Sequence, residues 1–234
     1  MRERLRQRPI GRGRNLKKFV APLTYAMVAL VGFSRTYKDS SSAELDYSAF
    51  RAINGLAGKY PALDVIMIGS AKYLAVVFAV ALIVLWLSWR SKNQRAAFLA
   101  GVSALVALGI GQIIGKLIPR PRPYLSHTIT QLIPRSLDTS FPSDHATLGF
   151  AVATMIWFFN RKAGGLLLIV ATLMAVSRVF VGAHYPGDII GGAVLGSLTS
   201  VTLAGLAQRR FVRNLLDRTF SRLARWRLAT RGAD

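Results

Sequence analysis

The stretch SRVFVGAHYPGD, residues 177–188, joins two long apolar runs and carries the most informative polar side chains of the chain. Its imidazole, His184, lies four residues before the carboxylate of Asp188 and six residues after an arginine. Two polar clusters upstream complement it, PSDH at residues 142–145 and RPRP at residues 120–123. Histidines, a carboxylate and several guanidiniums are the groups needed to bind and cleave a phosphate ester.

The composition indicates an integral membrane protein of one domain. Of the 234 residues, 52% are hydrophobic and 18% are charged, and the mean hydropathy is +0.37. Soluble domains carry about 25% charged residues. The chain has no cysteine, which excludes disulfides and thiolate metal sites. A phosphate bound by such a chain is expected to be attached to a lipid.

The formal net charge of +21 could suggest a nucleic-acid partner, but its distribution argues against one. Most lysines and arginines fall in short segments that flank apolar runs, as is typical of cytoplasmic loops and of contacts with anionic lipid. We therefore expect membrane lipids as partners and no nucleic acid. The basic segments are residues 1–18, 90–95, 161–162 and 209–231.

Apolar runs near the length of a membrane span, about 20 residues, predict about six transmembrane helices. With the N-terminus inside, every basic segment falls on the cytoplasmic side, as does the C-terminus. A signal peptide is the competing interpretation of the first run. Residues 47–56 could form a short helix on the outer surface, and residues 211–228 an amphipathic helix at the inner leaflet. The predicted spans are residues 19–37, 65–89, 96–118, 145–159, 164–183 and 189–207.

This topology brings the three polar clusters to one membrane face, the outer one. Each member also has a structural alternative: Ser143 and Asp188 are good helix caps, and Arg178 could extend to lipid headgroups. His145 could be a histidine at a helix start with only a hydrogen bond to offer. These alternatives do not explain why clusters distant in the sequence converge, so we expect a functional site there.

The combined motifs resemble the type 2 phosphatidic acid phosphatase superfamily, whose signature is K-x6-RP, then PSGH, then SR-x5-H-x3-D. Residues 177–188 match the third element in full, and residues 142–145 match the second with Asp144 in place of glycine. Arg122 and the following proline match the first element. Lys116 lies one residue closer to Arg122 than the signature requires, and Arg120 is a candidate substitute.

Within that superfamily, the chain looks most like the bacitracin-resistance type of undecaprenyl pyrophosphate phosphatase. The resemblance rests on residues 121–147 and covers roughly residues 46–207. It implies a helical membrane phosphatase core at 46–207. Residues 1–45 would be a basic cytoplasmic N-terminus with the first span, and residues 208–234 an arginine-rich cytoplasmic tail.

The resemblance also implies a mechanism. His184 would be the nucleophile, Asp188 its orienting carboxylate and His145 the general acid and base. The phosphate would be bound by Arg122, Arg178, Ser143, Arg120 and Lys116. We expect no cofactor and no metal, since Asp and Glu show no cluster at ligand spacing outside the motif.

The implied substrate is undecaprenyl diphosphate, a polyprenyl lipid phosphate, hydrolysed on the outer side of the bacterial cell membrane. Three alternatives remain beside it, the first of them an enzyme of the same class. One is a phosphatase for phosphatidic acid, phosphatidylglycerophosphate or lipid A, and another a non-catalytic lipid-phosphate binder or transporter. The third is a vanadate-binding peroxidase, against which the apolar spans argue.

Overall fold

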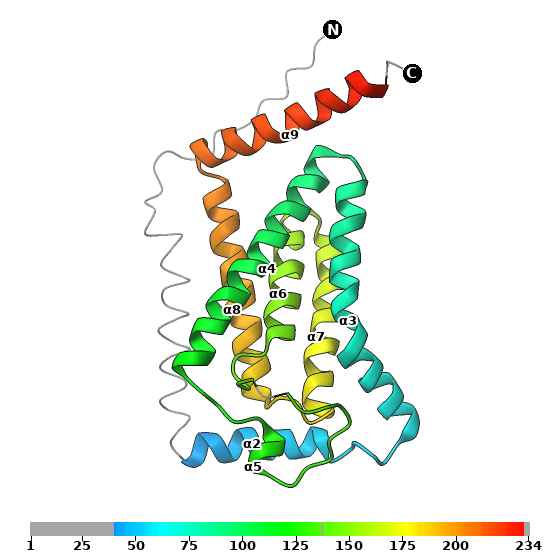
Figure 1. Cartoon of the computed structure of the whole chain (residues 1–234), viewed down its shortest axis with the longest axis vertical. Helices are drawn as coiled ribbons and strands as arrows, with labels where there is room; N and C mark the ends of the chain where they lie inside the picture. Colours follow the sequence, from blue (N-terminus) through cyan, green and yellow to red (C-terminus); the bar gives the residue numbers. More distant parts are fainter. Residues whose placement is uncertain (1–39, 137, 232–234) are drawn as a thin grey trace.

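The computed structural model describes residues 40–136 and 138–231, and these residues form helices and loops without a strand (Figure 1). The predicted all-α membrane bundle is therefore confirmed. The helices are α2 (Ser40–Asn54), α3 (Pro61–Leu87), α4 (Ser91–Leu117), α5 (Pro123–Ser126), α6 (Asp144–Phe159), α7 (Arg161–Phe180), α8 (Pro186–Ala207) and α9 (Arg210–Arg231).

Helix α6 lies at the centre of the bundle, where it packs most extensively against α8, α7 and α4 (Figure 1). Its side chains Val152, Met155 and Ile156 are buried, and they share one apolar core with Phe78 of α3 and Met174 of α7. Within a bilayer, these side chains stabilise the bundle through close van der Waals packing between helices, since the surrounding lipid is itself apolar.

Among the helices of the described residues, four are long and apolar enough to cross a membrane, namely α3, α4, α7 and α8. They correspond to four of the six predicted spans. The predicted span at 145–159 is α6, whose 16 residues extend about 24 Å, short of the roughly 30 Å hydrocarbon core. The predicted span at 19–37 and the basic segment at 1–18 lie outside the described residues.

Helices α6 and α8 pack backbone to backbone because α8 presents glycines to α6. A Cβ atom at Gly196 would lie 2.3 Å from the carbonyl oxygen of Thr147, and one at Gly192 would lie 2.6 Å from that of Ser143. No side chain fits at these distances. The GxxxG spacing thus marks close helix packing, and the contact fixes the start of α8 beside the start of α6.

Helices α2 and α9 lie across opposite ends of the bundle (Figure 1). Helix α2 begins earlier than the predicted surface helix at 47–56, and its last residue, Asn54, donates to the carbonyl oxygens of Thr130 and Phe180 at 2.7 and 2.8 Å. Helix α9 spans the amphipathic segment predicted at 211–228. Its Phe220 is buried against the ring of Trp86.

Candidate active site

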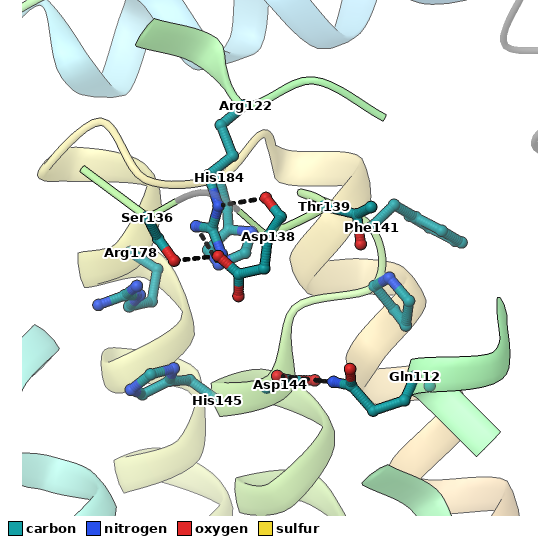
Figure 2. Close-up of a pocket in the computed structure, with 12 residues that line it drawn as sticks. Gln112, Arg122, Ser136, Asp138, Thr139, Phe141, Asp144, His145, Arg178 and His184 are labelled. Carbon is teal, nitrogen blue, oxygen red and sulfur yellow. Dashed lines mark hydrogen bonds and ion pairs between the residues drawn. The ribbon is translucent and has the colours of Figure 1, made fainter. Parts of the chain in front are cut away.

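A cavity of about 160 Å³ lies at the end of the bundle covered by α2, among the start of α6, the end of α7 and the loops that precede α6 and α8. Figure 2 shows Arg178 and His145 on one wall, with the hydrogen-bonded pair Gln112 and Asp144 across from them. The cavity is lined by Gly111, Gln112, Arg122, Ser136, Asp138, Thr139, Phe141, Pro142, Asp144, His145, Arg178 and His184.

His184 is almost completely buried, and its two ring nitrogens have different surroundings. Nδ1 lies 2.8 Å from the carbonyl oxygen of Ser140, and Nε2 lies 3.2 Å from Nη1 of Arg122. A carbonyl oxygen can only accept a hydrogen bond, so Nδ1 carries the proton. In the neutral ring, the lone pair of Nε2 is then directed toward the arginine that lines the cavity.

Asp188 supports His184 from the side away from the cavity. Its Oδ2 lies 3.6 Å from Nδ1 of His184 and accepts hydrogen bonds from Ser140 Oγ at 2.5 Å and from the Tyr185 amide at 2.8 Å. Its Oδ1 forms an ion pair with Arg120. Asp188 therefore holds the first turn of α8 and places a negative charge next to the imidazole, while Ser140 is the direct partner of Nδ1.

Arg122 lines the cavity, and several groups hold its guanidinium in place. Nη1 donates to the carbonyl oxygen of Ala183 at 3.0 Å, and Nη2 donates to Asp138 Oδ1 at 3.1 Å. Burial acts to raise the pKa of Asp138, but the Ser136 hydrogen bond and the Arg122 charge together hold that pKa below its ordinary value. Asp138 is thus an anion that faces the cavity beside Arg122.

Arg178 adds a second guanidinium from the last turn of α7. Its Nε is buried and has no hydrogen-bond partner within the described part of the chain. A buried, unpaired N–H group is costly unless a ligand satisfies it. Together with Arg122, this group makes the cavity suited to an anion with several oxygens, such as a phosphate, beside the unprotonated nitrogen of His184.

Three residues predicted to bind phosphate do not line this cavity. Arg120 instead forms ion pairs with Asp188 and Asp46. Lys116 is exposed on α4. Ser143 is buried with its amide donating to the carbonyl oxygen of Asp188 at 3.1 Å, so it joins the starts of α6 and α8. Of the five residues predicted to bind phosphate, Arg122 and Arg178 line the cavity, and the phosphate-binding roles themselves stay predictions.

Asp138, Ser140 and Gln112 are residues of the site or its support that the motifs did not predict. Asp138 and Ser140 lie in a loop, where side chains follow no helical or strand pattern. Their positions depend on how this loop folds back onto Tyr124, whose hydroxyl accepts a hydrogen bond from the Ser136 amide at 2.8 Å. Gln112 donates to both carboxylate oxygens of Asp144 at 3.1 Å. The substitution of aspartate for glycine in PSDH was the one available signal for this last pair.

No group of three or more His, Cys, Asp or Glu side chains that could hold a metal ion occurs within residues 40–136 and 138–231. The charged groups of the cavity that can donate hydrogen bonds to an anion are the guanidiniums of Arg122 and Arg178. The described side chains can therefore bind a phosphate directly, through hydrogen bonds and charge.

Comparisons with known proteins agree with this geometry. The profile of the PAP2 superfamily, the type 2 phosphatidic acid phosphatases, matches residues 96–211. Undecaprenyl-diphosphatase BcrC of Bacillus subtilis (strain 168) is 37% identical over 151 residues, which are 64% of this chain and 78% of that protein. The bacitracin transport permease protein BcrC of Bacillus licheniformis is 34% identical over 179 residues, 76% of this chain and 88% of that protein.

A solved structure shares the fold at low sequence identity. It is the first transmembrane PAP2 type phosphatidylglycerolphosphate phosphatase from Bacillus subtilis, with a TM-score of 0.64 and 17% identity over 81% of this chain and 97% of that one. The sequence relatives and the shared fold lead to the same conclusion. The chain belongs to the PAP2 superfamily and, within it, resembles the bacitracin-resistance type.

Proposed function

We propose that this membrane protein, a lipid phosphatase by family, removes the terminal phosphate of undecaprenyl diphosphate through a phosphohistidine intermediate. The observation that carries the proposal is the approach of His184 Nε2 to Arg122 Nη1 at 3.2 Å, in a cavity that Arg178 and His145 also line. A nucleophilic nitrogen beside two guanidiniums is the arrangement that phosphoryl transfer needs, because charge develops on the equatorial oxygens of the transferred group.

In the first step, Nε2 of His184 attacks the terminal phosphorus, and the bond from that phosphorus to the bridging oxygen breaks. Arg122 and Arg178 bind the oxygens of the transferred group. The leaving group is undecaprenyl phosphate, and His145 supplies its proton. Asp188 offsets the positive charge of the phosphorylated ring, while the Ser140 carbonyl retains the Nδ1 proton and thus the orientation of the imidazole.

In the second step, neutral His145 removes a proton from water, and the oxygen of that water attacks the phosphorus bound to His184. The P–N bond breaks and inorganic phosphate leaves. His145 is then protonated and ready for the next leaving group, so the two steps together consume one water molecule and restore both histidines.

The preference for a polyprenyl diphosphate rests on the relatives, among which is a protein named undecaprenyl-diphosphatase. The polar cavity lies at one end of the apolar helices, so a headgroup can enter it while the hydrocarbon chain stays in the bilayer. We assign this end to the outer side, because the basic 90–95 and 161–162 segments and α9 lie at the other end. Residues 46–207 form the catalytic core in this proposal, and residues 208–234 a cytoplasmic tail.

The test is phosphate release by the purified protein from undecaprenyl diphosphate, phosphatidic acid, phosphatidylglycerophosphate and lipid A, with and without excess EDTA. We expect the highest kcat/KM with undecaprenyl diphosphate and no effect of EDTA. A higher kcat/KM with phosphatidylglycerophosphate would assign the chain the activity named for the solved structure. Tight binding without turnover would favour a transporter, and loss in EDTA with recovery in Mg²⁺ would contradict the metal-free mechanism.

Activity should persist at acidic pH. Burial lowers the pKa of His184, and this effect exceeds the opposing effect of Asp188. A lowered pKa keeps the imidazole neutral, and hence nucleophilic, to a lower pH. We expect the acid limb of the kcat/KM profile below the ordinary histidine pKa of about 6.5.

Profiles with two substrates that ionise differently would identify this limb. If the acid limb reports an ionisation of the enzyme, it falls at the same pH with both substrates. If it reports an ionisation of the substrate, its pH differs between the two substrates. A shared acid limb above pH 6.5 would contradict the assignment to a buried His184.

A further inference from the structure

Helix α2 contributes a buried carboxylate to the far side of the active site. The side chain of Asp46 is 10% exposed, and its Oδ2 forms an ion pair with Nη2 of Arg120 at 2.7 Å. Its Oδ1 accepts a hydrogen bond from the amide of Gly187 at 2.8 Å. The approach is close, because a Cβ atom at Gly187 would lie 3.0 Å from Asp46 Oδ2. Asp46 therefore contacts the segment between His184 and Asp188 directly.

Arg120 connects Asp46 to the catalytic carboxylate. Its Nη1 donates to Asp188 Oδ1, its Nη2 donates to Asp46, and the guanidinium lies 4.0 Å from the centre of the Tyr185 ring. A planar guanidinium held by two carboxylates and an aromatic face has little freedom to rotate. The chain of contacts thus runs from α2 through Arg120 to Asp188 at the start of α8.

The charges of this chain of contacts matter for His184. With Asp46 present, the positive charge of Arg120 is shared by the carboxylates of Asp46 and Asp188. The three side chains together therefore keep a net negative charge next to the imidazole. Without Asp46, Arg120 and Asp188 would form a neutral pair. A neutral pair stabilises a cationic or phosphorylated imidazole less than a net negative charge does.

We infer that Asp46 is a positioning residue of the reaction, which acts through Arg120 and the Gly187 amide to hold Asp188 in place and keep its negative charge available to His184. This inference rests on the proposed function. Asp46 does not touch the cavity, so it acts on the chemical step and leaves substrate binding unchanged.

The measurement compares Asp46→Asn with wild type, using kcat, KM and the pH profile on undecaprenyl diphosphate. We expect kcat to fall roughly 10- to 100-fold, as for other groups that orient a reactive residue, with KM within about twofold of wild type. The acid limb should move to lower pH, since a cationic His184 loses stabilisation. The charged and titratable groups that face His184 are Asp188, Arg122, Arg178 and His145, and none of them is changed in this variant.

The matched control is Glu44→Gln, which removes one carboxylate from the exposed side of the same helix. It should leave kcat and the pH profile unchanged. In an Arg120→Gln background, Asp46→Asn should lower kcat less than it does in wild type, because the route through Arg120 is already broken and only the contact with the Gly187 amide remains. If Asp46→Asn does not fold, Arg120→Lys is the second probe, since a lysine keeps the charge but cannot bridge both carboxylates.

Wild-type kcat in Asp46→Asn would overturn the inference. The inference would also be overturned if activity fell only in proportion to the amount of folded protein, with an unchanged pH profile. That result would show that Asp46 only anchors α2 to the bundle. For Arg120→Lys, an unchanged kcat and pH profile would overturn it as well. His184→Ala is assayed in parallel. If phosphate release does not depend on His184, the proposed function fails. If it does depend on His184, a wild-type kcat in Asp46→Asn refutes this inference alone.

Discussion

His184→Ala is expected to lower kcat for phosphate release by about 10,000-fold or more, because it removes the nucleophile and leaves only substrate binding and the two arginines. The cavity would otherwise persist, since the contacts of Asp188 with Ser140, Tyr185 and Arg120 do not involve the ring. The measurement is the release of inorganic phosphate under saturating substrate. A rapid quench should also trap acid-labile phosphoprotein in wild type and none in the variant.

His127→Ala is the matched control, because the chain has 3 histidines and this one lies outside the cavity. His127 is exposed, and its ring stacks on that of Tyr47 with centroids 3.8 Å apart. We expect it to keep near-normal kcat and a normal yield of phosphoprotein. Residual activity above about one tenth in a folded His184→Ala protein would remove His184 from the nucleophilic role.

His145→Ala should lower turnover by roughly 100- to 10,000-fold, the range for loss of a general acid and base. The two steps do not depend on His145 equally. Polyprenyl phosphate is a weakly basic leaving group that departs with little help, whereas the alkoxide released from a phosphate monoester needs the proton. With undecaprenyl diphosphate the variant should therefore still phosphorylate His184, but hydrolyse the intermediate slowly because the base for water is missing.

A quench experiment separates these steps. With the diphosphate, His145→Ala should accumulate more phosphoprotein than wild type at steady state. With phosphatidic acid, a monoester, it should accumulate little, because phosphorylation itself becomes slow. Equal levels with both substrates would show that His145 does not act on the leaving group and the water in the manner proposed.

The main helices could be predicted from the sequence because apolar runs, basic flanks and caps are local signals. The pair His184 and Asp188 could be placed for the same reason, since a proline after Tyr185 begins a helix and Asp188 caps it. Helix α6 shows the limit of the length rule. Its 16 residues are buried by neighbouring helices, so it does not need the length of a lipid-facing span.

The arginines show what local signals could not decide. Arg120 and Arg122 are two residues apart in a proline-rich segment, and either could have faced the phosphate. In the structure, Arg122 contacts Nε2 of His184. Arg120 instead forms ion pairs with Asp188 and Asp46, on the side of His184 away from the cavity. That choice depends on the contact with α2, which lies more than 70 residues away in the chain. The position of Asp138 likewise depends on a tertiary contact, the one between its loop and Tyr124.

The glycines at which α8 meets α6 have a consequence for catalysis in a fluid membrane. Gly192 and Gly196 leave no side chain between the two backbones, so the helices that begin next to His145 and His184, the two histidines proposed to react, cannot slide apart without losing that contact. Helix α3, by contrast, exposes most of its apolar surface. We therefore expect variation in bilayer thickness or lipid composition to displace the outer helices more than the starts of α6 and α8, whose backbones hold His145 and His184 at a fixed separation.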